Sequence, residues 1–207
     1  MLSRRSILAL VLLLAILPGL LLSACVQAPD TVPAVGPVSG AAADVVLGDG
    51  VVLHLPGRPG FPADTRLTQL ITARYGDERR RFQADLDLGA EMVRVAFSVP
   101  GGVPVLGIRW SMDGILVDRQ VPALPDLDVA RVLGDIFLAF WPVEQVRRQL
   151  DPGAAFTATA GKRTLTVGDR SVLQITTTGP DARRRTVIRN HDQGYELIIL
   201  SRVAKAA

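Results

Sequence analysis

The side chains that could carry out acid–base or metal chemistry are few in this sequence. There are two histidines, His54 and His191. His191 precedes Asp192 and could form an acid–base pair with it, but the residues around them are also an ordinary turn sequence. His54 lies between two leucines in an alternating pattern, which is typical of an exposed position on a strand. Two isolated histidines and a lone cysteine do not make a recognisable metal or thiol site.

Two acidic triplets are the next candidates for a metal site. Asp85-Leu86-Asp87 and Asp126-Leu127-Asp128 both resemble the triplet with which sugar transferases bind a metal–nucleotide complex. The first lies in an alternating stretch that places both carboxylates on the solvent face of a strand. The second precedes a helical pattern, where carboxylates stabilise the positive end of the helix dipole. Gly48-Asp49-Gly50 is typical of a turn. Since each of these candidates has an ordinary structural explanation, we expect no catalytic residues, no metal ion, no cofactor and no enzymatic activity.

The single cysteine, Cys25, follows the most apolar segment of the chain. Two arginines precede sixteen almost purely apolar residues, 7–22, and two small residues follow them. A positive start, a short apolar core and a small-residue end are typical of a secretory signal peptide. A membrane-spanning helix is the alternative, but it needs roughly 20 apolar residues, and this run contains a Pro-Gly pair.

Leu22-Ser23-Ala24-Cys25 resembles a bacterial lipobox. In signals of that family the cysteine sulfur receives diacylglycerol, cleavage falls just before the cysteine, and its new amine receives an acyl group such as palmitate. The alternative is an ordinary signal with an incidental cysteine, which would leave an unpaired thiol in an oxidising compartment. Each buried methylene contributes about 0.8 kcal/mol, so several acyl chains on Cys25 would hold the protein on the membrane permanently.

The residue after the cysteine, Val26, bears on the location. In enterobacterial sorting an aspartate at that place retains lipoproteins in the inner membrane, so Val26 points to the outer membrane. We expect a lipid-anchored protein of the outer membrane with its domain in the periplasm, and the surface leaflet remains an alternative.

The composition divides the chain into three parts. Residues 1–24 are the expected lipoprotein signal peptide, residues 25–63 hold the acylated cysteine, a Pro/Ala/Gly-rich flexible tether and an N-terminal segment, and residues 64–203 form one domain. Removal of the signal peptide lowers the formal charge from +3 to +1, because it takes away two arginines. Nucleic acid is therefore not an expected partner.

Period-two alternation dominates the domain on both sides of its middle. Arg81–Leu88 alternates polar and apolar residues without exception, and Glu91–Val99 does the same, which is typical of strands with one wet face. Four or five antiparallel strands are expected over residues 66–121. Five more follow at 156–159, 163–167, 171–178, 184–190 and 194–200, and a first strand or hairpin is expected in 45–56.

The period changes to that of a helix in the middle of the chain. One apolar stripe is formed by Val129, Val132, Leu133, Ile136, Phe137 and Phe140. Asp126 or Asp128 can cap this helix, and Pro142 suits the first turn of a second helix that runs to Leu150. We therefore expect an α+β fold, in which a curved antiparallel half-barrel sheet of about nine to eleven strands carries the two helices on its concave face.

The lipobox, the strand meander and the mid-chain helix ending in FLAFWP resemble an uncharacterised proteobacterial family of predicted outer-membrane lipoproteins. That family in turn resembles the periplasmic lipoprotein carriers LolA and LolB by fold. The most specific stretch is Leu133–Leu150, and the resemblance covers roughly residues 64–201. It implies a half-barrel closed by helices, with an apolar cavity that accepts acyl chains.

Aromatic and large apolar residues are the candidates for contact with such a ligand. They are Phe97, Trp110, Leu133, Ile136, Phe137, Phe140 and Trp141. We expect an outer-membrane lipoprotein that binds an acyl chain, lipid or lipidated cargo in a half-barrel cavity and assists envelope lipid or lipoprotein delivery. The alternative is a non-catalytic envelope scaffold with a solid core, whose protein partner the sequence does not identify.

The strongest local positive charge lies in Arg79–Arg81 and Arg183–Arg185, both at expected strand starts. Solvated hairpin ends explain such clusters. Contact with anionic lipid headgroups is the alternative, at about 1 kcal/mol per charge close to the membrane surface.

Overall fold

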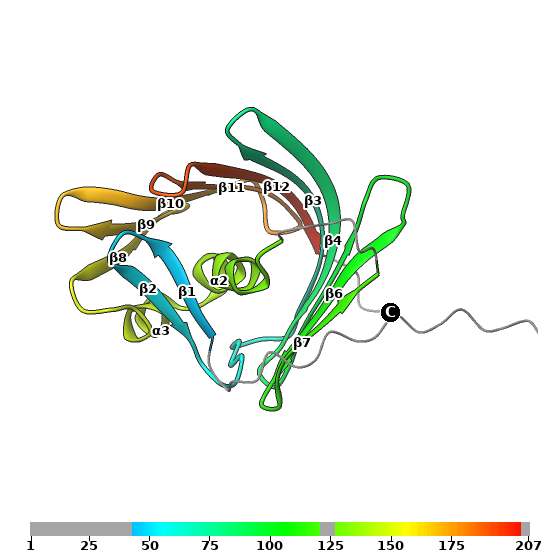
Figure 1. Cartoon of the computed structure of the whole chain (residues 1–207), viewed down its shortest axis with the longest axis horizontal. Coiled ribbons are helices and arrows are strands. Elements are labelled where there is room, and N and C mark those ends of the chain that lie inside the picture. The colour runs from blue at the N-terminus through cyan, green and yellow to red at the C-terminus, as the bar shows by residue number, and fades with distance from the viewer. Residues whose placement is uncertain (1–42, 121–126, 204–207) are drawn as a thin grey trace, which may run out of the picture. The chain divides into compact units, whose positions relative to one another are not determined.

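A large open antiparallel sheet dominates the structure. The computed structural model describes residues 43–120 and 127–203, and ten strands within them form one curved sheet (Figure 1). The strand order is β7-β6-β5-β4-β3-β12-β11-β10-β9-β8, so β3 and β12 meet in the middle, although they are the first and last strands of the sheet in sequence. The sheet does not close, because β7 and β8 remain as edges. Two further strands, β1 and β2, pair only with each other.

The strands have the following bounds: β1 Ala43–Gly48, β2 Val51–Leu55, β3 Thr65–Tyr75, β4 Glu78–Leu88, β5 Val93–Ser98, β6 Pro104–Ser111, β7 Gly114–Arg119, β8 Ala154–Thr159, β9 Lys162–Val167, β10 Arg170–Thr178, β11 Arg183–Asn190 and β12 Tyr195–Val203. Two helices lie between β7 and β8 in the described residues, α2 Val129–Phe140 and α3 Val143–Arg148. The predicted α+β class, the curved antiparallel sheet and the two mid-chain helices are therefore confirmed. The predicted helix to Leu150 ends at Arg148, and Leu150 instead bridges to Leu53 of β2.

The alternating pattern of the central strands sets the face that each side chain occupies. In β4, Phe82, Ala84, Leu86 and Leu88 are buried, and the residues between them are exposed or partly exposed. β3 pairs with β4 over its whole length, from Thr65 opposite Leu88 to Tyr75 opposite Glu78. A one-residue slip would move this apolar row to solvent, so burial of one face fixes the register.

The β1–β2 hairpin belongs to the same core as the large sheet. Val45, Leu47, Val51, Leu53 and Leu55 of the hairpin are fully buried among core residues of the sheet and of α2. The packed unit thus starts at β1, whereas the domain predicted from the sequence starts at residue 64. The predicted signal peptide, Cys25 and most of the predicted tether lie outside the described residues.

Two close approaches explain glycines at the hairpin and the helix. A Cβ on Gly48 would lie 2.3 Å from the Asp192 carboxylate, and one on Gly134 would lie 2.9 Å from Val45. Asp192 accepts a hydrogen bond from the Asp49 N–H at 3.2 Å, and Arg170 donates to the Asp49 carbonyl at 2.9 Å. Glycine therefore lets the hairpin pack directly on the β11–β12 turn and on α2.

Helix α2 is held at both ends by side chains. The Asp128 carboxylate accepts a hydrogen bond from the Arg131 N–H at 3.1 Å, which confirms Asp128 as a cap, whereas Asp126 lies outside the described residues. At the other end Arg163 of β9 donates to the carbonyls of Leu138 and Trp141, at 2.8 and 2.6 Å. A guanidinium there complements the negative end of the helix dipole. Burial lowers the pKa of Arg163.

Among the described residues no helix is long and apolar enough to cross a membrane.

Candidate functional site

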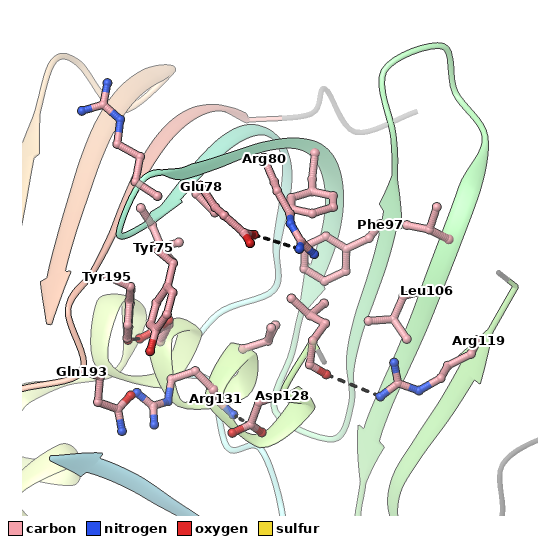
Figure 2. A pocket seen from close by; sticks show the side chains of 18 residues that line it. Tyr75, Glu78, Arg80, Phe97, Leu106, Arg119, Asp128, Arg131, Gln193 and Tyr195 are labelled. Atoms are coloured by element: carbon pink, nitrogen blue, oxygen red, sulfur yellow. Dashed lines mark hydrogen bonds and ion pairs between the residues drawn. The ribbon is translucent and has the colours of Figure 1, made fainter. Parts of the chain in front are cut away.

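A cavity opens where α2 faces strands β3, β4, β5, β6, β7 and β12. Its volume is about 560 Å³, within the range of about 300–1,000 Å³ that is usual for small-molecule sites. Figure 2 shows the side chains around it, which come from both halves of the sheet and from α2. We call it the outer cavity. Its charged lining residues are Arg74, Glu78, Arg80, Arg119, Asp128, Arg131 and Asp135.

A second, smaller cavity adjoins the first and lies between α2 and the sheet. We call it the inner cavity. Its volume is about 90 Å³, and it shares seven lining residues with the outer cavity: Ala73, Phe82, Phe97, Leu127, Val132, Asp135 and Leu197. The rest of its lining is almost wholly apolar, with Ile71, Ala84, Leu86, Val95 and Ile199 from the sheet and Ile136, Ala139 and Phe140 from α2. The outer cavity thus carries the charged side chains, and the inner one is lined almost wholly by apolar side chains.

Asp135 lies at the junction, because it lines both cavities. It is only 6% exposed, and its carboxylate accepts a hydrogen bond from the Tyr195 hydroxyl at 2.7 Å. Burial raises the pKa of Asp135 to about 7, against the lowering effects of Tyr195 and the nearby Arg131 guanidinium. The pKa of Tyr195 is also raised, mainly by burial and then by the Asp135 charge, so its hydroxyl remains a donor.

Arg131 of α2 brings a partly unsatisfied charge to the outer cavity. Its Nη2 donates to the carbonyl of Val46 in β1, and its guanidinium lies 5.6 Å from the centre of the Tyr195 ring. The Nε and Nη1 atoms are buried and have no hydrogen-bond partner within the described part of the chain. Buried donors without partners are costly, more so when charged. The hydrogen-bonding capacity of this arginine is therefore not fully used within the described residues.

The other arginines of the outer cavity differ in how fully they are neutralised. Arg80 pairs with Glu78 at 2.9 Å, and Arg74 lies 3.5 Å from Glu196. Arg119 of β7 donates to the Leu127 carbonyl at 3.4 Å and, within the described residues, forms no ion pair. The predicted basic cluster Arg79–Arg81 is thus not only a solvated hairpin end, because Arg80 lines the cavity.

The residues predicted to contact a ligand fall into two groups. Phe97, Ile136 and Phe140 line the inner cavity, and Phe97 lines the outer one as well. Trp110, Leu133, Phe137 and Trp141 line neither of these cavities. They are packed together: the Phe137 ring centre is 6.3 Å from that of Trp110 and 3.5 Å from that of Trp141. The structure places this second group in solid core.

His54 forms two side-chain interactions that its exposed position on a strand does not predict. Its Nδ1 lies 2.7 Å from a carboxylate oxygen of Asp44, and its Nε2 lies 2.9 Å from one of Asp151. These hydrogen bonds, to Asp151 first and Asp44 second, raise the pKa of His54. Both ring nitrogens are occupied and face opposite ways. The three residues form a clasp between β1, β2 and the turn before β8, and no group of His, Cys, Asp or Glu in the described ranges has the arrangement of a metal site.

The remaining sequence candidates have structural partners. Asp192 pairs with Arg170 and not with His191, and this pairing is the main cause of its lowered pKa. Asp85 accepts a hydrogen bond from the Thr68 hydroxyl at 2.7 Å, and Asp87 pairs with Arg66 at 2.9 Å. Arg184 of the second basic cluster pairs with Asp181. None of these residues lines the two cavities.

The polar residues of the site, Arg119, Arg131, Asp135 and Tyr195, were not candidates from the sequence. Asp135 could have been noticed in the sequence, because it is a carboxylate within a helix whose apolar pattern predicts burial. In the structure it is one of six consecutive buried residues of α2. Arg119, Arg131 and Tyr195 carry no such signal, because their elements meet only in the folded chain. A perturbed carboxyl in a cleft is typical of functional sites. Among the residues that the structure describes, no serine, cysteine or histidine lines either cavity.

Comparison with known proteins gives a family for this chain. A search of curated proteins found no significant match. A family model described as Protein of unknown function (DUF3261) matches residues 66–202, which is more than half of the chain. The matched range begins in β3 and ends in β12, so it includes both helices and every residue that lines the two cavities. The chain belongs to the DUF3261 family.

Proposed function

We propose that this protein is a lipid-anchored outer-membrane lipoprotein that binds an acyl chain, without catalysis, between α2 and the concave face of its sheet. The observation that carries the proposal is the pair of adjoining cavities, one with charged residues at its opening and one almost wholly apolar. In this proposal α2 covers part of the concave face and leaves the inner cavity free for the chain.

The lining chemistry supports an acyl ligand over a compact polar one. Phe82, Phe97, Ile136, Phe140 and Leu197 present apolar surface to the inner cavity. Each methylene that moves from water into such surroundings contributes about 0.8 kcal/mol. An extended chain would reach these residues through the outer cavity, because the two cavities share lining residues.

Photo-crosslinking tests the binding site. The full chain is extracted from membranes, placed in phosphatidylcholine nanodiscs and exposed to palmitic acid that carries a diazirine near its methyl end. We expect labelled peptides from α2 and from β4 and β5. Labelling confined to the outer face of the sheet, or absent from all three elements, would contradict the proposal.

A cavity-filling variant and a matched control sharpen this test. Ala139 lines the inner cavity, whereas Ala96 is exposed on β5. Ala139→Phe should reduce labelling at least tenfold, because the new ring occupies the space of the chain. Ala96→Phe adds the same ring elsewhere and should leave labelling unchanged. Equal labelling of both variants would remove the inner cavity from the proposal.

The membrane anchor is tested separately. Cys25→Ser should release the protein from the outer-membrane fraction, because a serine cannot form the thioether to diacylglycerol. Mass spectrometry of the mature N-terminus measures the same property directly. A Cys25→Ser variant that remains in that fraction would contradict lipidation, but would leave ligand binding untouched.

The alternative function is a non-catalytic envelope scaffold. Leu70 and Leu200 favour it, since they pair across β3 and β12 while 50% and 49% exposed. Cross-linking from cysteines placed at these two positions would capture a protein partner if this surface is used. Capture of a partner together with no acyl labelling would favour the scaffold.

A further inference from the structure

The charge distribution along the two cavities differs sharply, and this bears on the class of ligand. Four arginines, Arg74, Arg80, Arg119 and Arg131, line the outer cavity, whereas none lines the inner one. An amphiphile in the two cavities would therefore place its tail away from all four guanidinium groups and its head among them.

The carboxylates of the outer cavity do not neutralise these arginines completely. Glu78 is paired with Arg80, and Asp128 accepts a hydrogen bond from the Arg131 N–H in the first turn of α2. Asp135 is buried against the Tyr195 hydroxyl, where a low-dielectric environment favours its neutral form. The positive charges of Arg119 and Arg131 remain: among the described residues, a backbone carbonyl accepts from each, and Arg131 also lies over the Tyr195 ring.

Arg131 gives a second observation that points to an anionic ligand, because two of its donors lack a hydrogen-bond acceptor within the described residues. Its Nε and Nη1 are buried and have no hydrogen-bond partner in the described ranges, although buried guanidinium donors are normally satisfied. A guanidinium donor forms a charge-assisted hydrogen bond with a carboxylate or phosphate oxygen, which is about twice as strong as a neutral one. Figure 2 shows Arg80, Arg119 and Arg131 around one opening, from β4, β7 and α2.

We propose that the ligand is a single-chain anionic amphiphile whose acid group binds Arg131 and Arg119 in the outer cavity while its chain enters the inner cavity. This inference rests on the proposed function and names its ligand class. A single chain follows from the small volume of the inner cavity, about 90 Å³ beside about 560 Å³ outside. A fatty acid and a lysophosphatidic acid share this chemistry.

Four photoreactive probes with the same chain separate head from tail. They are palmitic acid, its methyl ester, a lysophosphatidic acid and a lysophosphatidylcholine, each carrying the same diazirine. The full chain in phosphatidylcholine nanodiscs is titrated with each probe, and labelling of the α2 peptide is measured. We expect the two anionic probes to half-saturate at concentrations at least tenfold lower than the ester and the choline lipid. Stronger labelling by palmitic acid than by lysophosphatidic acid would identify the ligand as a carboxylate lipid. The reverse order would identify it as a phosphate lipid.

Three variants test the arginines. Arg131→Gln and Arg119→Gln should each weaken the anionic probes about tenfold, the size expected for a hydrogen bond to a charged group, and leave the ester unchanged. Arg109→Gln is the matched control, because Arg109 is exposed on β6 and lines neither cavity. Thermal unfolding identifies a variant that fails to fold, and Arg119→Lys, which keeps the charge, should recover part of the loss.

The outcomes separate this inference from the proposed function. Equal labelling by the acid and the ester, with no effect of Arg119→Gln or Arg131→Gln, would overturn the anionic head and keep an acyl ligand. Absence of labelling by all four probes, the ester included, would overturn the proposed function itself.

Discussion

The two sides of helix α2 resemble each other in sequence but differ in the folded protein. On one side Leu133, Phe137 and Leu138 are fully buried, and Phe137 packs against Trp110 and Trp141. On the other side Val132, Ile136 and Ala139 line cavities, together with Asp135. An apolar stripe thus indicates which residues leave solvent, but not whether they meet other side chains or an internal space.

The largest expected effect contrasts these two sides directly. Phe137→Ala should lower the free energy of unfolding by about 3–5 kcal/mol, since it empties a filled position. Ile136→Ala should cost about 2 kcal/mol, at the low end for such truncations, because the residue already borders a cavity. Urea denaturation measures both. Equal losses would show that the two sides are packed alike.

A pH-dependent effect follows from Asp135, the charged residue of the cavity side. Its pKa of about 7 in the folded protein lies above its ordinary 3.8. The folded state therefore binds this proton more tightly, so its stabilising effect is complete below pH 3.8 and is lost as pH rises to 7. Asp135→Asn should stabilise the protein at pH 8, by up to about 4 kcal/mol, and remove this dependence.

The groups around Asp135 define the control for that measurement. Arg131 and Asp128 face it from its own helix, and Tyr195 faces it from β12. Across the outer cavity lie Arg74 of β3 with Glu78 and Arg80 of β4. Tyr195→Phe removes the hydrogen bond and should raise the pKa of Asp135 further. Unfolding curves for Asp135→Asn that parallel those of the natural chain from pH 4 to 8 would contradict the assignment.

Gly134 tests how tightly the packed side is closed. A Cβ there would lie 2.9 Å from Val45 of β1, so Gly134→Ala should cost about 1–2 kcal/mol despite the higher helix propensity of alanine. Addition of Val45→Ala removes the methyl groups that collide with the new Cβ. In urea denaturation, the free energy of unfolding of the double variant should then fall by less than the sum of the losses of the two single variants. Strict additivity would show that the clash is absent.

The smallest effect concerns the His54 clasp, which holds the β1–β2 hairpin on the packed side. Its raised pKa means that protonated His54 stabilises the fold below pH 6.5, and that this effect is lost as pH rises through the folded value. His54→Gln should cost less than about 1 kcal/mol, because the side chain is half exposed and solvent screens the pair. The loss should appear at pH 5.5 and vanish at pH 9. A loss that is equal at both pH values would assign it to packing.

Local patterns predicted the elements well, because each element depends on its own residues. The strict alternation of Arg81–Leu88 predicted a strand, which is β4. The helical spacing from Val129 to Phe140 predicted a helix, which is α2. The same patterns do not separate the residues that line the cavities from those that pack in the core. Phe97, Ile136 and Phe140 lie on the cavities, whereas Trp110, Leu133, Phe137 and Trp141 are in solid core, because size and apolarity suit both places.

The sequence by itself determined the class of fold, the order of elements and the place where a cap of α2, Asp126 or Asp128, was to be found. Periodicity and capping act over a few residues and are visible in one dimension. Only the tertiary structure decided that Asp135 of α2, Tyr195 of β12 and Arg119 of β7 line one cavity. Strands far apart in sequence become neighbours when the chain closes its long loops, so an internal space between them leaves no mark on any single segment.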